Sequence, residues 1–277
     1  MHESLSGYPS SLCRFRLLLL VCLSSVFTLA NAGDASRCDT LVASGNPEYP
    51  PMLWQSTSNP GTLTGAVPAL LQEIVEPLGI EVVVRDRGTW ARVQHLARQG
   101  NIDLVAGAFL TNERREFLDY VSPPITWAPT NVWVHRGNEF NYRWWSDLRG
   151  KRGSTLINNS FGQDFDEFAE NYLSIEGIRT IEQSFRMAKL GRVDYVLYEH
   201  LQGHTRLAKL GMDEEFVDLQ PPVSSEGLYF AFPKHSACNT EAFREAFTRR
   251  LEEVTEQRRI DQLVEEYTER YLNATSY

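Results

Sequence analysis

Two adjacent arginines, Arg114 and Arg115, stand in the stretch LTNERREFLDYVSPPI, which covers residues 110–125. They lie at the start of a short predicted helix. A guanidinium group is permanently charged and can hold a carboxylate through two parallel hydrogen bonds. The alternative is that both arginines are solvated surface charges, because exposed arginines are common. The residue types therefore allow an anion site here, and the rest of the chain has to support or weaken it.

A second pair of residues that could bind a ligand is His200 and His204. They are four residues apart and could share one face of a helix. That spacing resembles half of a zinc site. No HExxH motif accompanies the pair, so we interpret both as exposed polar residues and predict no metal site. The chain also has neither a GxGxxG motif nor a phosphate-binding loop, which argues against nucleotide-driven chemistry. No catalytic pair stands out, and no cofactor is predicted.

These residues are positioned by strands that alternate with helices. Strands are predicted at 40–46, 80–86, 102–109, 130–136, 178–184, 193–199 and 228–234, with one more within 147–160. Helices are predicted at 66–79, 90–100, 161–173, 185–192 and 240–272. The alternation is typical of βαβ units and a mostly parallel sheet. Two similar units in succession, with no low-complexity linker, predict an α/β protein of two lobes.

The N-terminus carries export signals. Arg14 and Arg16 precede an uncharged apolar run at 17–29, and ANA at 30–32 is a small-residue cleavage pattern. The run is too short to cross a membrane as a stable helix, so residues 1–32 are predicted to be a secretory signal peptide rather than an uncleaved anchor. We expect a soluble, exported mature chain that begins at Gly33.

The mature chain is acidic and has two cysteines. Without the leader, 25 Lys and Arg stand against 35 Asp and Glu, a net charge of −10. Such a surface argues against nucleic acid or an anionic membrane as the partner. Cys38 and Cys238 remain after cleavage, and an even pair in an oxidising compartment predicts a disulfide. Two free thiols are the alternative.

The chain resembles the family-3 extracytoplasmic solute-binding proteins, the polar amino-acid-binding type of periplasmic binding protein. Each motif is loose alone, but together they follow the family's order and spacing over essentially the whole mature chain. They are NPEYPPMLW (46–54), LTGAVPALLQEIVEPLG (63–79), GNIDLVAG (100–107), TNERREFLDYVSPPI (111–125), DLRGKR (147–152), LGRVDYVLYE (190–199) and LYFAFPKHS (228–236).

The resemblance implies a type II periplasmic-binding-protein fold, an α/β fold of two lobes joined by two hinge strands. Lobe one would comprise 37–128 and 226–277, lobe two 129–225, and the hinges would fall near 127–130 and 224–227. Cys38 and Cys238 would then both lie in lobe one. The implied protein is a periplasmic monomer that binds a small solute and reports to a membrane transporter or receptor.

The resemblance also implies a ligand site. Arg114 matches the arginine that holds the ligand's α-carboxylate in relatives, with Arg115 as the alternative by spacing. Ser160 matches a loop hydroxyl beside a helix N-terminus that holds the same carboxylate, although an ordinary N-cap serine is the alternative. Glu199 lies where relatives bear an aspartate that contacts the α-ammonium. Cleft-lining aromatic side chains and a close backbone approach complete the set, at Tyr49, Trp54, Trp90 and Gly107.

Two other functions remain open at this point. A few relatives of this fold are enzymes, such as periplasmic cyclohexadienyl dehydratase, in which a cleft carboxylate is a general acid, and Glu199 or Glu226 could take that role. The protein could also sense its ligand rather than deliver it. We predict a binding protein without catalytic activity. The residue types suit an aromatic, a cationic or a non-amino-acid carboxylate equally well as the ligand.

Overall fold

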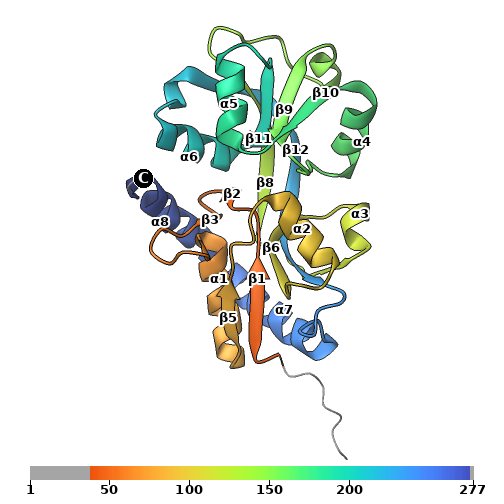
Figure 1. Cartoon of the computed structure of the whole chain (residues 1–277), viewed down its shortest axis with the longest axis vertical. Helices are drawn as coiled ribbons and strands as arrows, with labels where there is room; N and C mark the ends of the chain where they lie inside the picture. Colours follow the sequence, from red (N-terminus) through yellow and green to blue (C-terminus); the bar gives the residue numbers. More distant parts are fainter. Residues whose placement is uncertain (1–37, 275–277) are drawn as a thin grey trace, which may run out of the picture. The chain divides into compact units, whose positions relative to one another are not determined.

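The computed structural model describes residues 38–274, so the predicted signal peptide and its cleavage site lie outside the described residues. Within 38–274, nine strands form one mixed sheet in the order β10-β9-β11-β8-β12-β6-β1-β5, with β7 paired to β12 (Figure 1). The fold is therefore α/β, as predicted. The strands of this sheet are β1 (Thr40–Ser44), β5 (Glu81–Val84), β6 (Leu104–Phe109), β7 (Leu118–Tyr120), β8 (Thr126–His135), β9 (Arg152–Leu156), β10 (Ser174–Ile178), β11 (Tyr195–Glu199) and β12 (Phe216–Pro233).

One group of elements, group one, is built on the parallel strands β1, β5 and β6. Every residue of β6, LVAGAF, is buried, as expected of a strand covered on both faces. Its helices are α1 (Ala66–Val75), α2 (Trp90–Arg98), α3 (Asn112–Arg115), α7 (Glu241–Glu256) and α8 (Arg259–Asn273), with the short helix η1 (Glu76–Leu78). A small antiparallel sheet of β2 (Glu48–Tyr49), β3 (Leu53–Gln55) and β4 (Leu63–Thr64) belongs to the same group.

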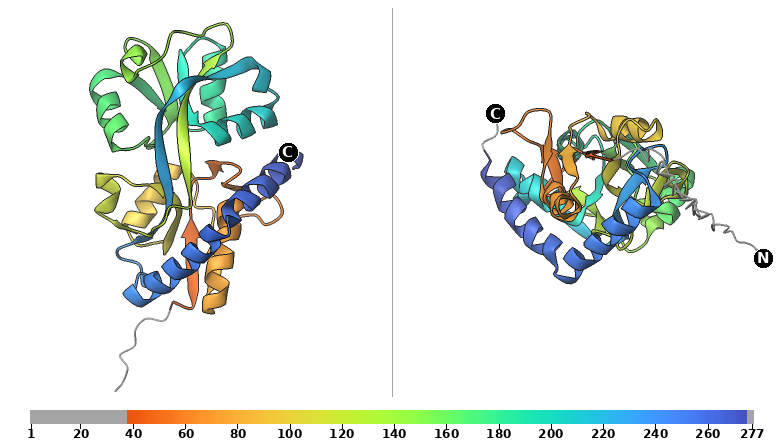
Figure 2. Two further views of the ribbon diagram at one scale, coloured as in Figure 1. Left: turned by 180° about the vertical axis from the view of Figure 1, so that it is seen from behind. Right: turned by 90° about the horizontal axis from the view of Figure 1, so that it is seen from below.

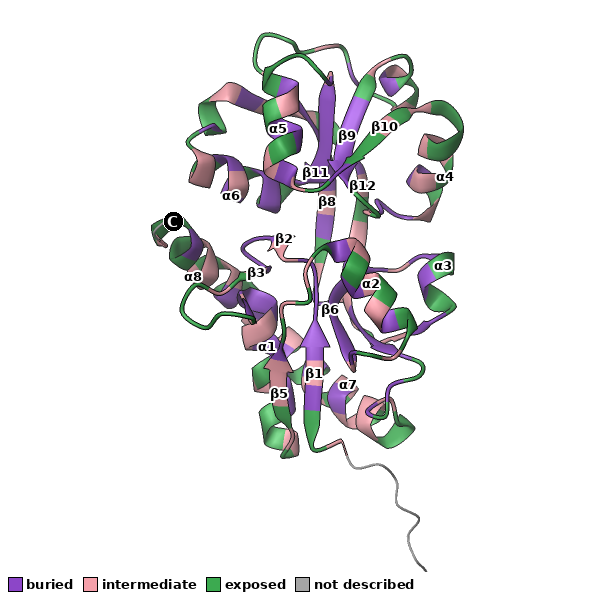
Figure 3. Cartoon of the chain, in the orientation of Figure 1, coloured by how far each residue is buried: buried purple, intermediate pink, exposed green. Residues whose placement is uncertain are grey.

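Helix α1 shows why these segments fold as they do. Its buried residues recur at helical spacing and form one apolar face, and Gly79 ends the following turn with a φ of 74°. That face packs against α7 and α8, which Figure 2 shows as two successive helices set at an angle to each other. Figure 3 shows the buried residues concentrated on the strands and on the inward helix faces.

Group two is built on the parallel strands β9, β10 and β11, with helices α4 (Gln163–Tyr172), α5 (Ile181–Lys189) and α6 (His200–Leu210). The short helices η2 (Trp145–Leu148) and η3 (Asp213–Glu215) belong here as well. The predicted strand at 178–184 is wrong, because β10 ends at Ile178 and α5 begins at Ile181. The Thr180 hydroxyl caps α5 by accepting a hydrogen bond from Gln183 N. A threonine followed three residues later by glutamine is a helix-start pattern, which the prediction of a strand here did not take into account.

The two long strands β8 and β12 pair with each other, and β8 also pairs with β11 of group two while β12 pairs with β6 of group one. The two predicted hinge segments are direct partners, since Trp127 pairs with Gly227 and Thr130 with Ser224. The register of β12 shifts between Leu219 and Ser224, where the chain carries two consecutive prolines. The two groups are thus connected by a pair of antiparallel strands rather than by a linker without regular structure.

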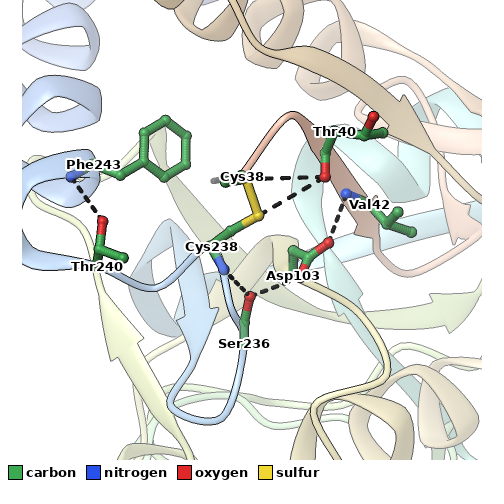
Figure 4. The surroundings of a disulfide bond; sticks show 8 residues. All are labelled: Cys38, Thr40, Val42, Asp103, Ser236, Cys238, Thr240 and Phe243. Carbon is green, nitrogen blue, oxygen red and sulfur yellow. Dashed lines mark hydrogen bonds between the residues drawn. A yellow bond between two sulfur atoms is a disulfide. The ribbon is translucent and has the colours of Figure 1, made fainter. Parts of the chain in front are cut away.

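The predicted disulfide is present, joining Cys38 before β1 to Cys238 after β12 (Figure 4). Next to it, the Asp103 carboxylate accepts a hydrogen bond from Val42 N (3.0 Å) and another from the Ser236 hydroxyl (2.7 Å). That hydroxyl in turn accepts from Cys238 N at 3.0 Å. The disulfide and Asp103 therefore tie the same two segments together.

Loss of this disulfide is expected to lower the free energy of unfolding by about 2–5 kcal/mol, because a closed loop of 200 residues restricts the unfolded chain strongly. The comparison is between the oxidised protein and a variant with both Cys38→Ser and Cys238→Ser, unfolded in urea. Reductant should destabilise the wild type and leave the double variant unchanged. Identical midpoints for the two proteins would show that the bond contributes nothing to stability.

Candidate solute-binding site

A cavity that encloses about 280 Å³ of empty space, open solvent included, lies where the carboxyl ends of β1, β6 and β11 come together. This edge of a parallel sheet is the usual place for a ligand in open α/β folds. Group one and group two both contribute residues. The lining is Asn46, Tyr49, Trp90, Gly107, Ala108, Phe109, Arg114, Asn159, Glu199 and Leu228.

Arg114 is the cation of this cavity. Its side chain is only 4% exposed, and Thr111 caps the short helix α3 that carries it. The guanidinium donates to Phe109 O at 3.1 Å and, over 3.4 Å each, to Gln94 Oε1 and Asn158 O. Its carbon lies 5.4 Å from the ring centre of Trp90, within cation–π range. Arg115, the neighbouring residue, is exposed to solvent.

The charge of Arg114 is not neutralised by a nearby side chain. Among residues 38–274, no carboxylate lies within salt-bridge distance of it. Burial accordingly lowers the pKa of Arg114 from its ordinary value. Since a guanidinium has five N–H donors and three are engaged, two remain for an anion in the cavity.

Glu199 is the anion of the cavity. It is the last residue of β11 and the N-cap position of α6, and it is 2% exposed. Burial raises the pKa of Glu199 to about 7, against the opposing influence of Asn159 and Arg114. A carboxyl group in this environment gains its charge near neutral pH, and it would be stabilised in that form by a cationic ligand group.

Three buried polar atoms in the lining have no hydrogen-bond partner among the described residues: Tyr49 Oη, Asn159 Nδ2 and Glu199 Oε2. The Asn159 amide approaches the Glu199 carboxyl as a hydrogen-bond donor and lowers its pKa, but the pair falls outside ordinary hydrogen-bond geometry. A buried polar atom without a partner costs about 1–3 kcal/mol. Their convergence on one cavity indicates a polar ligand that supplies both an acceptor and a donor.

Groups one and two contact each other on both flanks of the cavity. On one flank, Gln94 Nε2 donates to Asn158 O (3.1 Å), and Asn112 N donates to the Gln163 side chain (3.2 Å). On the other, Arg206 of α6 forms a 2.8 Å ion pair with Glu48. Loops and helices from each group thus enclose the lining residues.

Sequence comparison decides the family. Residues 41–270 match the profile of the bacterial extracellular solute-binding proteins, family 3. The chain belongs to this family. The family is one of solute-binding proteins rather than enzymes, and no helix within the described residues is long and apolar enough to cross a membrane.

Individual proteins similar to this solute-binding protein bind amino acids. It is 25% identical over 189 residues to the L-cystine-binding protein TcyJ of Escherichia coli K12, covering 66% of this chain and 68% of TcyJ. The L-arginine-bound AbpA of Streptococcus pneumoniae, an amino acid ABC transporter substrate-binding protein, has a TM-score of 0.71 at 18% identity over 85% of this chain and 97% of AbpA. A mutant of ArgBP from T. maritima has a TM-score of 0.69 at 21% identity over 83% and 95%.

Five of the seven predicted site residues of this solute-binding protein lie together in the cavity: Tyr49, Trp90, Gly107, Arg114 and Glu199. Gly107 has a φ of 103°, a conformation that favours glycine. It is the extra residue of a β-bulge, because Ala108 pairs with Tyr229 and Ala106 with Phe230. The bulge turns this piece of backbone towards the cavity.

The other two predicted residues lie elsewhere. Trp54 packs edge-on against Tyr267 and Tyr271 of α8, with ring centres 6.0 and 5.2 Å away, so its surface is used in packing. Ser160 lines a neighbouring cavity, where its hydroxyl donates to Asp166 and accepts from Gly162 N. Its hydrogen bonds hold the turn before α4. Glu226, considered above as a general acid, does not line the central cavity either.

Ala108 and Phe109 line the cavity next to the predicted Gly107, and three further lining residues were not predicted: Asn46, Asn159 and Leu228. Asn46 lies two residues after the end of β1, so its place at the carboxyl end of a parallel strand was a usable signal. Asn159 stood in the loop examined for Ser160, one residue away. Leu228 had no such signal, because it reaches the cavity only through the pairing of β12 with β6.

Proposed function

We propose that this protein captures a small zwitterionic solute of the amino-acid type and presents it to a membrane partner. The supporting observation is the pair of buried, oppositely charged groups, Arg114 and Glu199, in one small cavity. Neither has a salt-bridge partner among the described residues. Because the two charges enter from opposite groups of elements, one solute can bridge them.

In the proposed complex, the α-carboxylate accepts hydrogen bonds from the two unused N–H groups of Arg114. The α-ammonium donates to Glu199 Oε2. Tyr49 Oη and Asn159 Nδ2 offer further partners, and the bulged backbone at Gly107 allows close approach. The face of Trp90 lies beside the guanidinium and supplies an apolar wall.

The lining also supports a proposal for the ligand's side chain. Arg114 and Glu199 are the only charged residues of the lining within 38–274, and the charged groups of the amino-acid head group pair with both. A charged side chain would then be buried without a partner, at a large cost. We therefore propose a compact solute with an uncharged side chain, rather than the arginine found in the structural relatives.

The proposal includes two lobes that close over the solute. Lobe one comprises 37–128 and 226–277, lobe two comprises 129–225, and closure bends the paired segments 127–130 and 224–227. A ligand that contacts both lobes shifts the population towards the closed form by its extra contacts there. The protein acts in the periplasm after removal of its signal peptide, with a membrane transporter as its partner.

A thermal-shift screen of residues 33–277 against neutral, cationic and anionic amino acids tests the proposal. A true ligand at about one hundred times its Kd adds about 2.7 kcal/mol of stability and raises the Tm. We expect shifts from neutral amino acids, loss of the shift with the α-amide or N-acetyl form, and recovery of unmodified ligand. Shifts that survive blocking of either head-group charge would contradict the proposal, and consumption of the ligand would indicate an enzyme.

A further inference from the structure

A cluster of metal-ligating side chains, none of which lines the cavity, is formed by α6 and β12. His200 and His204 occupy successive turns of α6, and Asp218 lies on β12. One ligand atom from each of the three comes within 4.8 Å of the others. The histidine side chains are 46% and 53% exposed, and that of Asp218 is 18% exposed, so the cluster can be reached from solvent.

The distances suit one metal ion. His200 Nδ1 lies 2.9 Å from Asp218 Oδ2, and His204 Nε2 lies 3.7 Å from Asp218 Oδ1. Zinc–ligand bonds of 2.0–2.2 Å in a tetrahedron place neighbouring ligand atoms roughly 3.3 Å apart. The observed separations fall on both sides of that value, so small side-chain rotations would complete the geometry. The two histidines come from successive turns of one helix, and their ligand atoms also lie within 4.8 Å of each other.

The carboxylate is held in place by groups that are not ligands. Asp218 Oδ2 accepts hydrogen bonds from Asn131 Nδ2 at 2.6 Å and from Gln220 Nε2 at 3.2 Å. Asn131 is 1% exposed and lies on β8, and its Nδ2 is also 3.4 Å from His200 Nδ1. Amide groups that orient a ligating carboxylate are typical of functional metal sites. The ring of Trp133 lies beneath the histidines, with its centre 4.9 Å from that of His204.

We infer that His200, His204 and Asp218 form a binding site for a divalent transition-metal ion such as Zn²⁺. Two imidazoles and one carboxylate are a donor set that suits zinc and its neighbours in the periodic table, and they leave one position for water. Hard cations such as Mg²⁺ and Ca²⁺ prefer all-oxygen sites and are not expected to bind. The histidine spacing alone was insufficient to predict this site, because the third ligand is supplied by β12.

A bound ion would link α6 to β12 next to the solute cavity. His200 directly follows Glu199 in sequence, so the ion would fix the first turn of the helix that Glu199 caps. The same helix contacts group one through Arg206 and Glu48. The metal site would thereby stiffen the part of group two that faces group one.

Zinc titration of the full mature protein, freed of any affinity tag and stripped with chelator, tests the inference by calorimetry. We expect one equivalent of Zn²⁺ to bind and to raise the Tm, with reversal by chelator. His204→Gln and Asp218→Asn should each weaken binding at least about 100-fold, and Asn131→Ala about 10- to 100-fold. His235→Gln is the matched control, since His235 is exposed and remote in sequence from the cluster, and it should bind as the wild type does.

Titration with Co²⁺ separates a metal site from a purely structural ion pair. A tetrahedral Co²⁺ complex has visible absorption bands, which should form in the wild type and be absent in Asp218→Asn. Metal-free Tm values identify variants that fail to fold, and Asp218→Asn preserves the shape of the side chain. The inference is overturned if the wild type binds no zinc, or if the variants bind it as tightly as the wild type.

Discussion

Replacing Arg114 with alanine is expected to weaken solute binding by about 10²- to 10³-fold while the protein stays folded. In the proposed complex the guanidinium is the only cation that contacts the ligand's carboxylate among the described lining residues. Truncating one member of a buried, hydrogen-bonded charge pair costs about 2–5 kcal/mol, and about 1.4 kcal/mol corresponds to a factor of ten. Calorimetric titration with the ligand found in the screen would measure the loss.

Folding should survive this substitution because the unliganded protein gains little from Arg114. Its buried charge has no carboxylate partner among the described residues, and burial already disfavours that charge. The Phe109 carbonyl that it contacts also accepts a hydrogen bond from the Tyr120 hydroxyl at 2.9 Å. The unliganded Tm of Arg114→Ala should therefore stay within a few degrees of the wild type.

Arg115→Ala is the matched control, since it removes the same charge one residue away from an exposed position. It should bind the solute normally. Arg114→Lys should recover only part of the affinity, because an ammonium group cannot make two parallel hydrogen bonds from one plane. Normal binding by Arg114→Ala, or loss of binding in Arg115→Ala, would refute the assigned role.

Local features of the sequence were sufficient to predict most of the fold. The βαβ alternation, the stop at Gly79 and the cysteine pair follow from short stretches of chain and from the physics of helices, strands and export. The strand predicted at 178–184 is wrong because helix α5 begins inside that segment, at Ile181. Capping decided the outcome there, because the Thr180 hydroxyl satisfies a backbone donor that would otherwise be unpaired.

Site residues were harder to predict because side-chain roles depend on distant partners. Trp54 resembled a cleft aromatic in sequence, but α8, more than two hundred residues later, provides two tyrosines for it to pack against. Ser160 resembled a ligand-binding hydroxyl in sequence, but its hydroxyl donates a hydrogen bond to Asp166 instead. Asp218 lies near His200 and His204 because β12 pairs with β8. No local sequence pattern encodes that pairing.

Glu199→Gln is expected to weaken binding of a zwitterionic solute by about 10²-fold at pH 8 and to remove its pH dependence. The wild-type carboxyl has a pKa of about 7 and must be ionised to hold the ammonium group. The Kd of the wild type should therefore be constant above pH 7 and rise about tenfold for each pH unit below it. Titrations between pH 5 and pH 8 would show both regimes.

The free energy of unfolding without ligand should fall as the pH rises, whereas binding of the solute becomes tighter. This difference distinguishes a binding role of Glu199 from a structural one. The pKa of Glu199 is raised from 4.5, so the folded protein binds this proton more tightly than the unfolded chain does. The resulting stability is fully present below pH 4.5 and is lost as the pH rises through 7, a difference of about 3 kcal/mol at most.

Asp166 and Glu226 also have raised pKa values and contribute with the same sign, so the difference between wild type and Glu199→Gln isolates this one group. Above pH 7 the unliganded variant should be more stable than the wild type, although it binds solute less well. Higher stability together with weaker binding is expected when a buried charge serves to bind the ligand and destabilises the unliganded protein. A Glu199→Gln protein that is both less stable and equally able to bind would instead assign the carboxylate to the packing of α6.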